Sequence, residues 1–230
     1  MPVLECSRCN ELFYSASGTN STQCENCGGN VWRVFDDEAS FDRVAARPRT
    51  SQPGDHLGIV YSDPGEAADF CARYVREGLG RGELVIAVLP ETLEKQLERR
   101  LSERERAQLQ VAEAGAAYTN FDPHTLIAWY EGVVQGTDAN VRVLAGPDGD
   151  SAAEIAPDDW RMFEQLIHDR VHELGVTGLC LYDVPSLPGE FMSMAMRAHP
   201  LLVMRRGELL RNPEFRYDGP APPPEQAGQA

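Results

Sequence analysis

The sequence is short of positive charge. Its 230 residues include 21 lysines and arginines against 36 acidic residues, which gives a formal net charge of -15, and Lys95 is the only lysine. Binding to nucleic-acid phosphates requires clustered cationic side chains. The composition therefore argues against a nucleic-acid-binding surface for the chain as a whole.

The sequence also lacks a hydrophobic run long enough to cross a bilayer. Its first residues, from Met1 to Cys6, show neither the basic start nor the apolar core of a secretory signal peptide. We therefore expect a cytoplasmic protein without membrane contact, whose thiols are mostly reduced and free to bind metal. The length suffices for one sizeable domain and a small appendage.

Four of the six cysteines form two C-x-x-C pairs near the N-terminus: Cys6, Cys9, Cys24 and Cys27. Each pair places two thiolates on one side of a tight knuckle, and four thiolates complete a tetrahedron around Zn²⁺. Fourteen residues separate the pairs, slightly fewer than is usual in zinc ribbons. Phe13-Tyr14 and Val31-Trp32 supply short strands, so the sequence predicts a four-cysteine zinc ribbon over residues 1–34.

Two alternatives to zinc are weaker. A disulfide framework would require secretion, and a redox C-x-x-C would begin a helix in a β-α-β context. The ribbon could be structural, since so few residues build no core alone, or it could dock a partner. Arg8 and Arg33 are balanced by nearby glutamates, so we expect docking or structure rather than DNA binding. Residues 35–54 are acidic and then rich in Pro, Ser and Gly, which is typical of a linker.

The most informative stretch runs from His56 to Leu89 and is typical of a strand-helix-strand unit. The apolar run that ends at Tyr61 indicates a strand buried on both faces. Asp63 and Pro64 are typical of a helix N-cap and a first helical residue, and a second apolar strand ends at Leu89. Such β-α-β units build parallel sheets.

The turn between this strand and helix is where a nucleotide-hydrolysing protein carries its phosphate loop, G-x-x-x-x-G-K-[ST]. Here residues 63–69 contain no Lys, Ser or Thr, and instead carry the carboxylates Asp63, Glu66 and Asp69. These carboxylates would repel a triphosphate. We therefore expect an ATPase-like frame that has lost hydrolysis, and not an enzyme.

The rest of the main domain alternates between strand and helix patterns. Strands are expected at 109–112, 141–145, 179–182 and 201–204, with a turn at 146–149. Helices are expected at 90–102, from Asp122-Pro123 onward, at 157–174 and at 191–198. This alternation predicts an α/β fold with a mostly parallel sheet and flanking helices. We expect a disordered tail at 218–230 from its Pro, Gly and Ala content.

Two segments carry a resemblance to a known family: HLGIVYSDPGEAADFCARYVREGLGRGELVIAVLPE, and LCLYDVPSLPGEFMSMAMRAHPLLVMRRGELLRNPEF far downstream. The His-apolar-Tyr opening, the EGL-x-x-GE turn, the C-L-Y-D strand end and the A-H-P are the most specific pieces. Together they resemble the MEDS domain, the methanogen/methylotroph sensory domain named after a dichloromethane-responsive repressor. The resemblance spans residues 55–217.

The resemblance implies a three-layer fold related to RecA-like ATPases but degenerate. It also implies sensing of small, often hydrocarbon-derived molecules by a domain that is commonly joined to histidine kinase or DNA-binding modules. His56 and His199 match histidine positions of the family, so each is a candidate to contact a ligand or a metal. For both, a structural hydrogen bond is the alternative.

Further candidates follow from the geometry of open parallel sheets, which bind ligands beyond the carboxyl ends of their strands. Tyr61, Asp63, Tyr182 and Asp183 are expected there, although strand-end turn or cap roles are the alternative. Met192, Met194, Met196 and Met204 are either core filling or an adaptable pocket wall.

Two remaining pairs of residues are ambiguous. Cys71 and Cys180 sit on apolar faces, where a thiol behaves as a small hydrophobe; redox sensing would require a lowered pKa. His168 and His172 are four apart on a helix but lack the H-E-x-x-H pattern of a zinc pair.

The sequence thus favours a non-catalytic sensor or adaptor that binds a small, apolar molecule or a signalling protein. The alternative is a transcription-associated regulator whose ribbon contacts DNA or polymerase. Assembly into a homo-oligomer stays open.

Overall fold

The computed structural model describes residues 51–112, 118, 120–204, 208–212 and 214–215, together with three short strands in the first 35 residues. The four cysteine side chains of the expected ribbon, most of the expected linker and the expected tail lie outside the described residues. No helix within the described ranges is long and apolar enough to span a membrane.

A seven-stranded sheet forms the centre of the main domain, in the order β10-β9-β4-β8-β7-β5-β6. Its strands are β4 (His56–Tyr61), β5 (Leu84–Val88), β6 (Gln110–Val111), β7 (Val141–Ala145), β8 (Thr177–Asp183), β9 (Leu201–Val203) and β10 (Leu209–Arg211). Neighbouring strands are parallel except β9 and β10, which are antiparallel. The expected mostly parallel sheet is confirmed.

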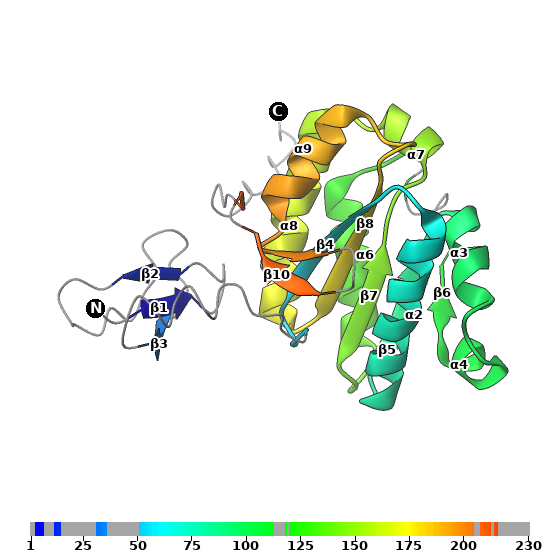
Figure 1. Ribbon diagram of the computed structural model, residues 1–230, viewed down its shortest axis with the longest axis horizontal. Helices are drawn as coiled ribbons and strands as arrows, with labels where there is room; N and C mark the ends of the chain where they lie inside the picture. Colours follow the sequence, from blue (N-terminus) through cyan, green and yellow to red (C-terminus); the bar gives the residue numbers. More distant parts are fainter. Residues whose placement is uncertain are drawn as a thin grey trace, which may run out of the picture.

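Helices cover both faces of this sheet and make three layers (Figure 1). One face carries α2 (Pro64–Gly80), α3 (Glu91–Glu98) and α4 (Glu103–Gln108). The other carries α6 (Pro123–Gln135), α8 (Pro157–Leu174) and α9 (Gly189–Ala198), and the short α7 (Gly149–Glu154) follows β7. The expected three-layer α/β class is therefore confirmed.

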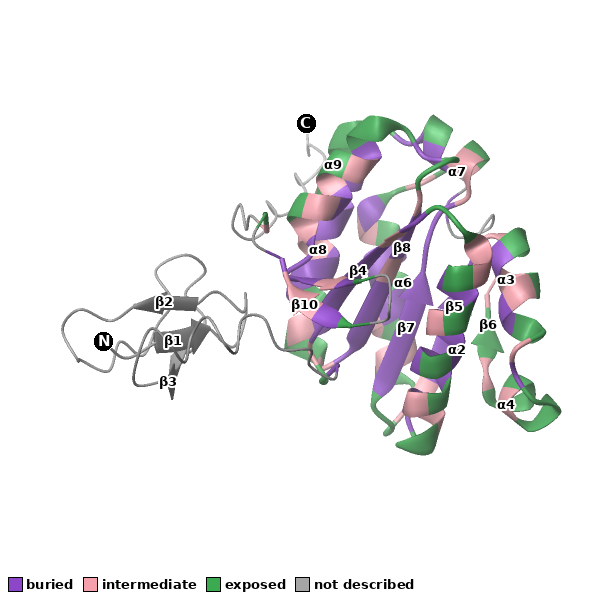
Figure 2. Ribbon diagram, viewed as in Figure 1, coloured by how far each residue is buried: buried purple, intermediate pink, exposed green. Residues whose placement is uncertain are grey.

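Each interface between sheet and helices has its own hydrophobic core. Cys71, Tyr74 and Leu97 belong to the core beneath α2 and α3. Trp160 and Phe163 belong to the core beneath α6, α8 and α9. Figure 2 shows the central strands almost wholly buried between these two layers, as expected for a parallel sheet covered on both faces.

The main helices begin and end where their capping residues predict. The Asp63 side chain accepts the Gly65 N–H at the start of α2, and Asp122 accepts from Thr125 at the start of α6. Pro follows each of these caps. Helix α8 ends at Gly175, whose φ of 65° lies in the left-handed region that favours glycine.

Four local features differ from the predictions. The helix expected at 90–102 ends at Glu98, because Ser102 caps a separate helix, α4, in a capping box with Glu105. The turn at 146–149 leads into α7, which Asp148 caps. Strand β10 was not predicted, and the strand expected at 109–112 spans only Gln110–Val111.

A buried ion pair joins several elements near the amino ends of the strands. Arg142 on β7 is fully buried, and its Nε lies 2.5 Å from Glu83 Oε2. Its Nη1 donates to Ser51 Oγ at 3.1 Å, and its guanidinium lies 4.3 Å from the centre of the Tyr74 ring. These contacts connect β7, the start of β5, helix α2 and the segment that precedes β4.

The N-terminal strands form a sheet of their own. Strands β1 (Val3–Cys6), β2 (Leu12–Tyr14) and β3 (Val31–Phe35) pair antiparallel in the order β2-β1-β3. Strands are thus present at the two places where the ribbon requires them. Zinc binding there stays a prediction.

Candidate functional site

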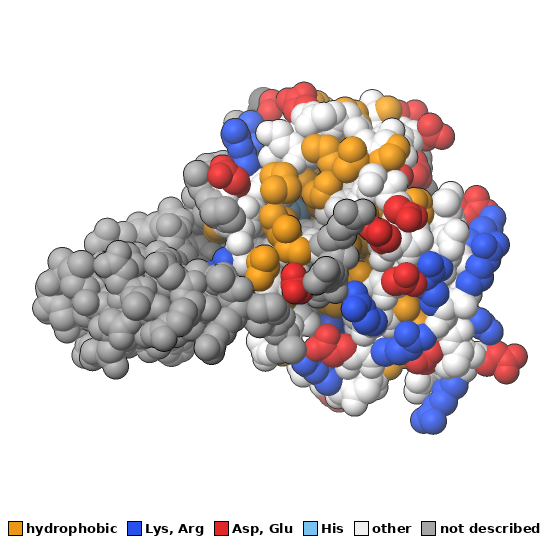
Figure 3. All heavy atoms as spheres, viewed as in Figure 1, with side chains coloured by type: hydrophobic (Ala, Val, Ile, Leu, Met, Phe, Trp, Pro, Cys, Tyr) orange, Lys and Arg blue, Asp and Glu red, His pale blue; other side chains and the backbone are white. Residues whose placement is uncertain are grey.

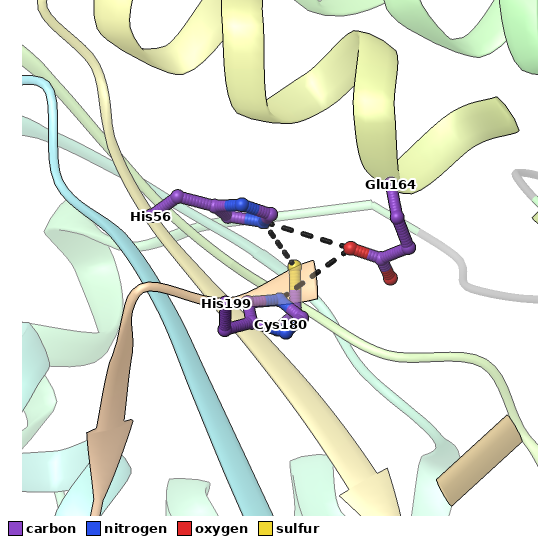
Figure 4. A group of neighbouring side chains, drawn as sticks. All are labelled: His56, Glu164, Cys180 and His199. Atoms are coloured by element: carbon purple, nitrogen blue, oxygen red, sulfur yellow. Dashed lines mark hydrogen bonds and ion pairs between the residues drawn. The ribbon is translucent and has the colours of Figure 1, made fainter. Parts of the chain in front are cut away.

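Four polar side chains that are far apart in sequence meet in the core between the sheet and helices α8 and α9. His56 opens β4, Glu164 lies on α8, Cys180 lies on β8, and His199 follows α9. Figure 4 shows the four side chains pointing toward one another. We call them the core cluster.

The atoms of the core cluster that could bind a metal lie within 4.8 Å of one another. His56 Nε2 is 3.4 Å from Cys180 Sγ and 3.7 Å from Glu164 Oε2. His199 Nε2 is 3.4 Å from the same Glu164 oxygen. The two imidazole rings lie 4.2 Å apart, between centroids.

The backbone holds His199 in a defined orientation and tautomer. His199 Nδ1 lies 2.8 Å from the Ala195 carbonyl oxygen, which only accepts, so Nδ1 carries the proton and Nε2 faces the cluster with its lone pair. The ring packs on the backbone of Gly58 in β4. A Cβ at Gly58 would meet the ring at 2.8 Å, so glycine is required for this close approach.

Gly58→Ala is expected to lower the free energy of unfolding by about 1–3 kcal/mol, because the added methyl displaces the buried His199 ring. Gly80→Ala is the matched control. A Cβ at Gly80 meets no atom within 4 Å, so alanine should leave stability unchanged or raise it by about 0.5–1 kcal/mol. Urea unfolding measures both. Equal stability of the two variants would mean that His199 does not pack on Gly58.

Burial keeps the core cluster uncharged. It raises the pKa of the Glu164 carboxyl to about 8 and lowers the pKa of His199 to about 4. Burial, followed by the neighbouring His199 and His168, lowers the pKa of His56 well below its usual value. Burial also raises the pKa of the Cys180 thiol. The groups therefore do not form ordinary ion pairs with one another.

The cluster is incompletely hydrogen bonded. Tyr182 OH donates to Glu164 Oε1, but Glu164 Oε2, His199 Nε2 and His56 Nδ1 have no hydrogen-bond partner among the described residues. A buried polar group left unpaired costs about 1–3 kcal/mol. Two imidazoles, a thiol and a carboxyl in such an arrangement are the ligand types that transition metals use in proteins.

An apolar cavity of about 30 Å³ adjoins the core cluster, between the sheet and helices α6 and α8. Most of its wall is aromatic or aliphatic and includes Tyr130 on α6, Trp160 and Phe163 on α8, and Ala145 on β7. His56, Cys180 and Tyr182 also line it, so His56 and Cys180 belong to both the cluster and the cavity wall.

A separate, polar cleft of about 570 Å³ lies beyond the carboxyl ends of the strands. Tyr61 and Asp183, which are register partners on β4 and β8, line it together with Asp148 and Asp150. Open parallel sheets bind ligands beyond the carboxyl ends of their strands. The cleft therefore lies on the side of the sheet where we expected a site.

At the start of α2 one backbone amide already has an internal acceptor, because Asp63 Oδ1 accepts the Gly65 N–H at 2.7 Å. The sequence pattern did not reveal that a cation also reaches this turn. Arg100 Nη2 donates to the Gly65 carbonyl at 3.0 Å, and its Nε lies 2.5 Å from Asp69 Oδ1. Arg100 is thus held by acceptors of the turn itself.

The structure places five of the six candidate ligand residues at two sites. His56 and His199 meet in the core cluster, and Tyr182 contacts it through Glu164. Tyr61 and Asp183 lie at the polar cleft, whereas Asp63 caps α2.

Sequence reasoning missed Glu164, and it treated Cys180 only as a small hydrophobe or a redox thiol. The available signal was the position of Glu164, four residues after Trp160 and three before Ile167, on the inner face of α8. A charged residue among inward-facing apolar residues indicates a buried polar site.

The structure also shows where the two ambiguous pairs of residues lie, Cys71 with Cys180 and His168 with His172. Cys71 is fully buried on the inner face of α2, and burial raises its pKa to about 12, which disfavours redox sensing. His168 packs its ring 5.6 Å from His56 and 5.4 Å from Phe215. The group of close potential ligand atoms among the described residues includes neither His168 nor His172.

The methionines divide between the two expected roles. Met192 and Met194 pack against the core beneath α8 and α9. Met196 and Met204 instead line a groove of mixed polarity with Phe70, Glu66 and Arg73, and Met204 is 45% exposed. Figure 3 shows hydrophobic side chains gathered on this face of the molecule.

The chain was compared with curated proteins, with solved structures and with protein-family models. No curated protein matches the chain. The chain is similar to the flagellar accessory protein FlaH from Methanocaldococcus jannaschii, with a TM-score of 0.46 and 14% identity over 80% of this chain and 89% of that one. It is also similar to a DnaB-like replicative helicase, with a TM-score of 0.41 and 10% identity over 58% and 40% of the two chains. Likenesses at this level say nothing of function.

A family model, described as the MEthanogen/methylotroph, DcmR Sensory domain, matches residues 55–200, which is more than half of the chain. The match covers β4 through α9 and includes all four residues of the core cluster. The chain therefore belongs to the MEDS family of sensory domains.

Proposed function

We propose that this MEDS domain is a sensor that binds a small apolar molecule in the cavity beneath α6 and α8. The observation that supports the proposal is the composition of the cavity wall, which is mostly aromatic and aliphatic. The exceptions are His56 and Cys180 of the core cluster and the ion pair between Glu131 on α6 and Arg170 on α8. Ligand sites of this kind are largely apolar with a few placed polar groups. Family membership supports the sensory role.

The size of the cavity limits the ligand. A cavity of about 10–15 Å³ holds one water molecule, so a volume of about 30 Å³ suits a ligand of only a few heavy atoms. Short hydrocarbons and their halogenated or oxygenated derivatives meet this limit. A nucleotide does not.

The wall offers a small number of polar contacts. Trp160 is buried, and its indole N–H has no hydrogen-bond partner among the described residues. A halogen or oxygen atom of the ligand could accept from this N–H. Cys180 and His56 supply further polar contacts at the edge of the cavity.

Ala145→Val is expected to weaken binding of dichloromethane and xenon at least about tenfold, because two methyl groups enter the cavity. Ala87→Val is the matched control. Ala87 lies on the adjacent strand β5, is equally a buried alanine, and belongs to the core on the opposite face of the sheet. Ligand-dependent shifts in the NMR spectrum of the full chain measure both affinities.

Two outcomes would count against the cavity as the ligand site. The first is wild-type protein that shows no shift with either probe. The second is a shift that Ala87→Val and Ala145→Val reduce to the same extent, because loss of stability would then explain both.

We further propose that the domain does not hydrolyse nucleotide. The turn at the start of α2 carries its own carboxylate cap, and the arginine that reaches it is engaged with Asp69 and the Gly65 carbonyl. The polar cleft next to it contains Asp148, Asp150 and Asp183, whose negative charge opposes binding of a triphosphate.

The N-terminal ribbon has a separate proposed role. Its four cysteines would hold Zn²⁺ and support a small surface for docking a signalling partner. Because the chain is acidic as a whole, a protein partner is favoured over DNA.

A further inference from the structure

We infer that His56, Glu164, Cys180 and His199 form a second metal site, which binds Zn²⁺ in the core of the sensory domain. This site is distinct from the predicted ribbon site, because its four ligands come from β4, α8, β8 and the residue after α9.

Three of the six distances among the four ligand atoms are close to those of tetrahedral zinc, and all six are within 4.8 Å. Zinc bonds of about 2.1 Å to nitrogen and oxygen place neighbouring ligand atoms about 3.4 Å apart, and the longer bond to sulfur, about 2.3 Å, raises this to about 3.6 Å. Glu164 Oε2 lies 3.4 Å from His199 Nε2 and 3.7 Å from His56 Nε2. His56 Nε2 lies 3.4 Å from Cys180 Sγ.

The set of donors selects the class of metal. A thiolate and two imidazoles disfavour Mg²⁺ and Ca²⁺, which prefer oxygen ligands. One sulfur, two nitrogens and one oxygen within 4.8 Å of one another suit four-coordinate Zn²⁺ and its spectroscopic substitute Co²⁺. The ion would also provide a partner for Glu164 Oε2 and His199 Nε2, which have no hydrogen-bond partner among the described residues.

Neighbouring groups orient the ligands. The His199 Nδ1–H donates to the Ala195 carbonyl, so the other ring nitrogen is free to bind the ion. Tyr182 OH donates to Glu164 Oε1, which leaves Oε2 for the ion. Metal-binding histidines and carboxylates in proteins usually have such partners, and losing one typically weakens metal affinity about 10–100-fold.

The test uses the full chain with all four ribbon cysteines replaced by serine, so that the core site is measured alone. Co²⁺ bound to a thiolate gives a charge-transfer absorption band. We expect this band in the ribbon-free chain, its loss in Cys180→Ser, and its retention in Cys71→Ser, the matched control with a fully buried thiol on the other face of the sheet. Tyr182→Phe should weaken Co²⁺ binding about 10–100-fold while the band persists at saturation.

Elemental analysis of the chain with its ribbon intact gives a second measure that does not depend on the folding of the ribbon-free variant. We expect one Zn²⁺ fewer per chain in Cys180→Ser than in the unchanged protein. A band unaffected by Cys180→Ser, or equal zinc contents of Cys180→Ser and wild type, would overturn the site. Neither measurement uses an apolar ligand, so a negative result for the metal site would not count against the proposed apolar ligand site. Likewise, a negative result with dichloromethane and xenon would not count against the metal site.

Discussion

Arg142→Ala is expected to lower the free energy of unfolding by about 3–5 kcal/mol, because it removes the buried cation from the buried Glu83 carboxylate and leaves only the more distant and more exposed Arg81, at 3.8 Å. The same change removes the cation from the face of Tyr74 and the donor to Ser51 Oγ. For a domain of this size, each kcal/mol corresponds to a shift in melting temperature of about 2–4 °C. Urea and thermal unfolding of the full chain measure the effect.

Arg161→Ala is the matched control. Arg161 is 59% exposed and pairs with Asp158 one turn earlier on α8, a surface ion pair that contributes little. We expect its removal to change stability by less than about 0.5 kcal/mol. If Arg142→Ala were as mild as Arg161→Ala, the buried pair would not connect the elements as described.

Trp160→Ala is expected to cost about 3–5 kcal/mol, since it removes a large side chain that is only 2% exposed. The Trp160 ring lies 5.4 Å from Phe163 and 5.3 Å from Phe191, so several aromatic contacts are lost together. The same substitution enlarges the apolar cavity that Trp160 lines. The variant should therefore bind benzene, which the unchanged cavity is too small to hold.

The measurement is the melting temperature with and without benzene, which should rise only for Trp160→Ala. Trp129→Ala supplies the control, because Trp129 is 39% exposed on α6 and does not line the cavity. We expect it to be milder and insensitive to benzene. Stabilisation of wild type and Trp160→Ala to the same degree would place benzene somewhere other than the cavity.

The parts of the fold that could be predicted depend on local chemistry. Asp63-Pro64 and Asp122-Pro123 mark helix starts by themselves. In α8 the stretch over which apolar residues recur every 3.6 residues indicates where the helix begins and ends. Helices α4 and α7 are six residues each, too short for a periodic pattern. Their signals were single capping residues, Ser102 and Asp148.

The candidate site could be predicted only in part, because it depends on contacts between distant residues. His56 and Cys180 meet through the parallel pairing of β4 with β8, and Glu164 joins them from a helix whose inner face was inferred from its apolar residues. The same limit explains Arg100, which reaches the α2 turn from 35 residues away. No local pattern reports such contacts.

The two sides of the domain thus differ in chemistry. Beyond the carboxyl ends of the strands lies an acidic, open cleft with Asp148, Asp150 and Asp183. Beneath α6 and α8 lies a small apolar cavity that shares His56 and Cys180 with the core cluster. We propose that the apolar cavity, and not the acidic cleft, is where the sensor binds its ligand.

A crystal structure of the full chain, exposed to xenon under pressure and soaked with ATP and Mg²⁺, tests this choice most directly. We expect a xenon atom between Trp160 and Ala145, and no nucleotide at the start of α2. Ordered phosphates against the turn from Asp63 to Ala67, with the interior cavity empty, would contradict it.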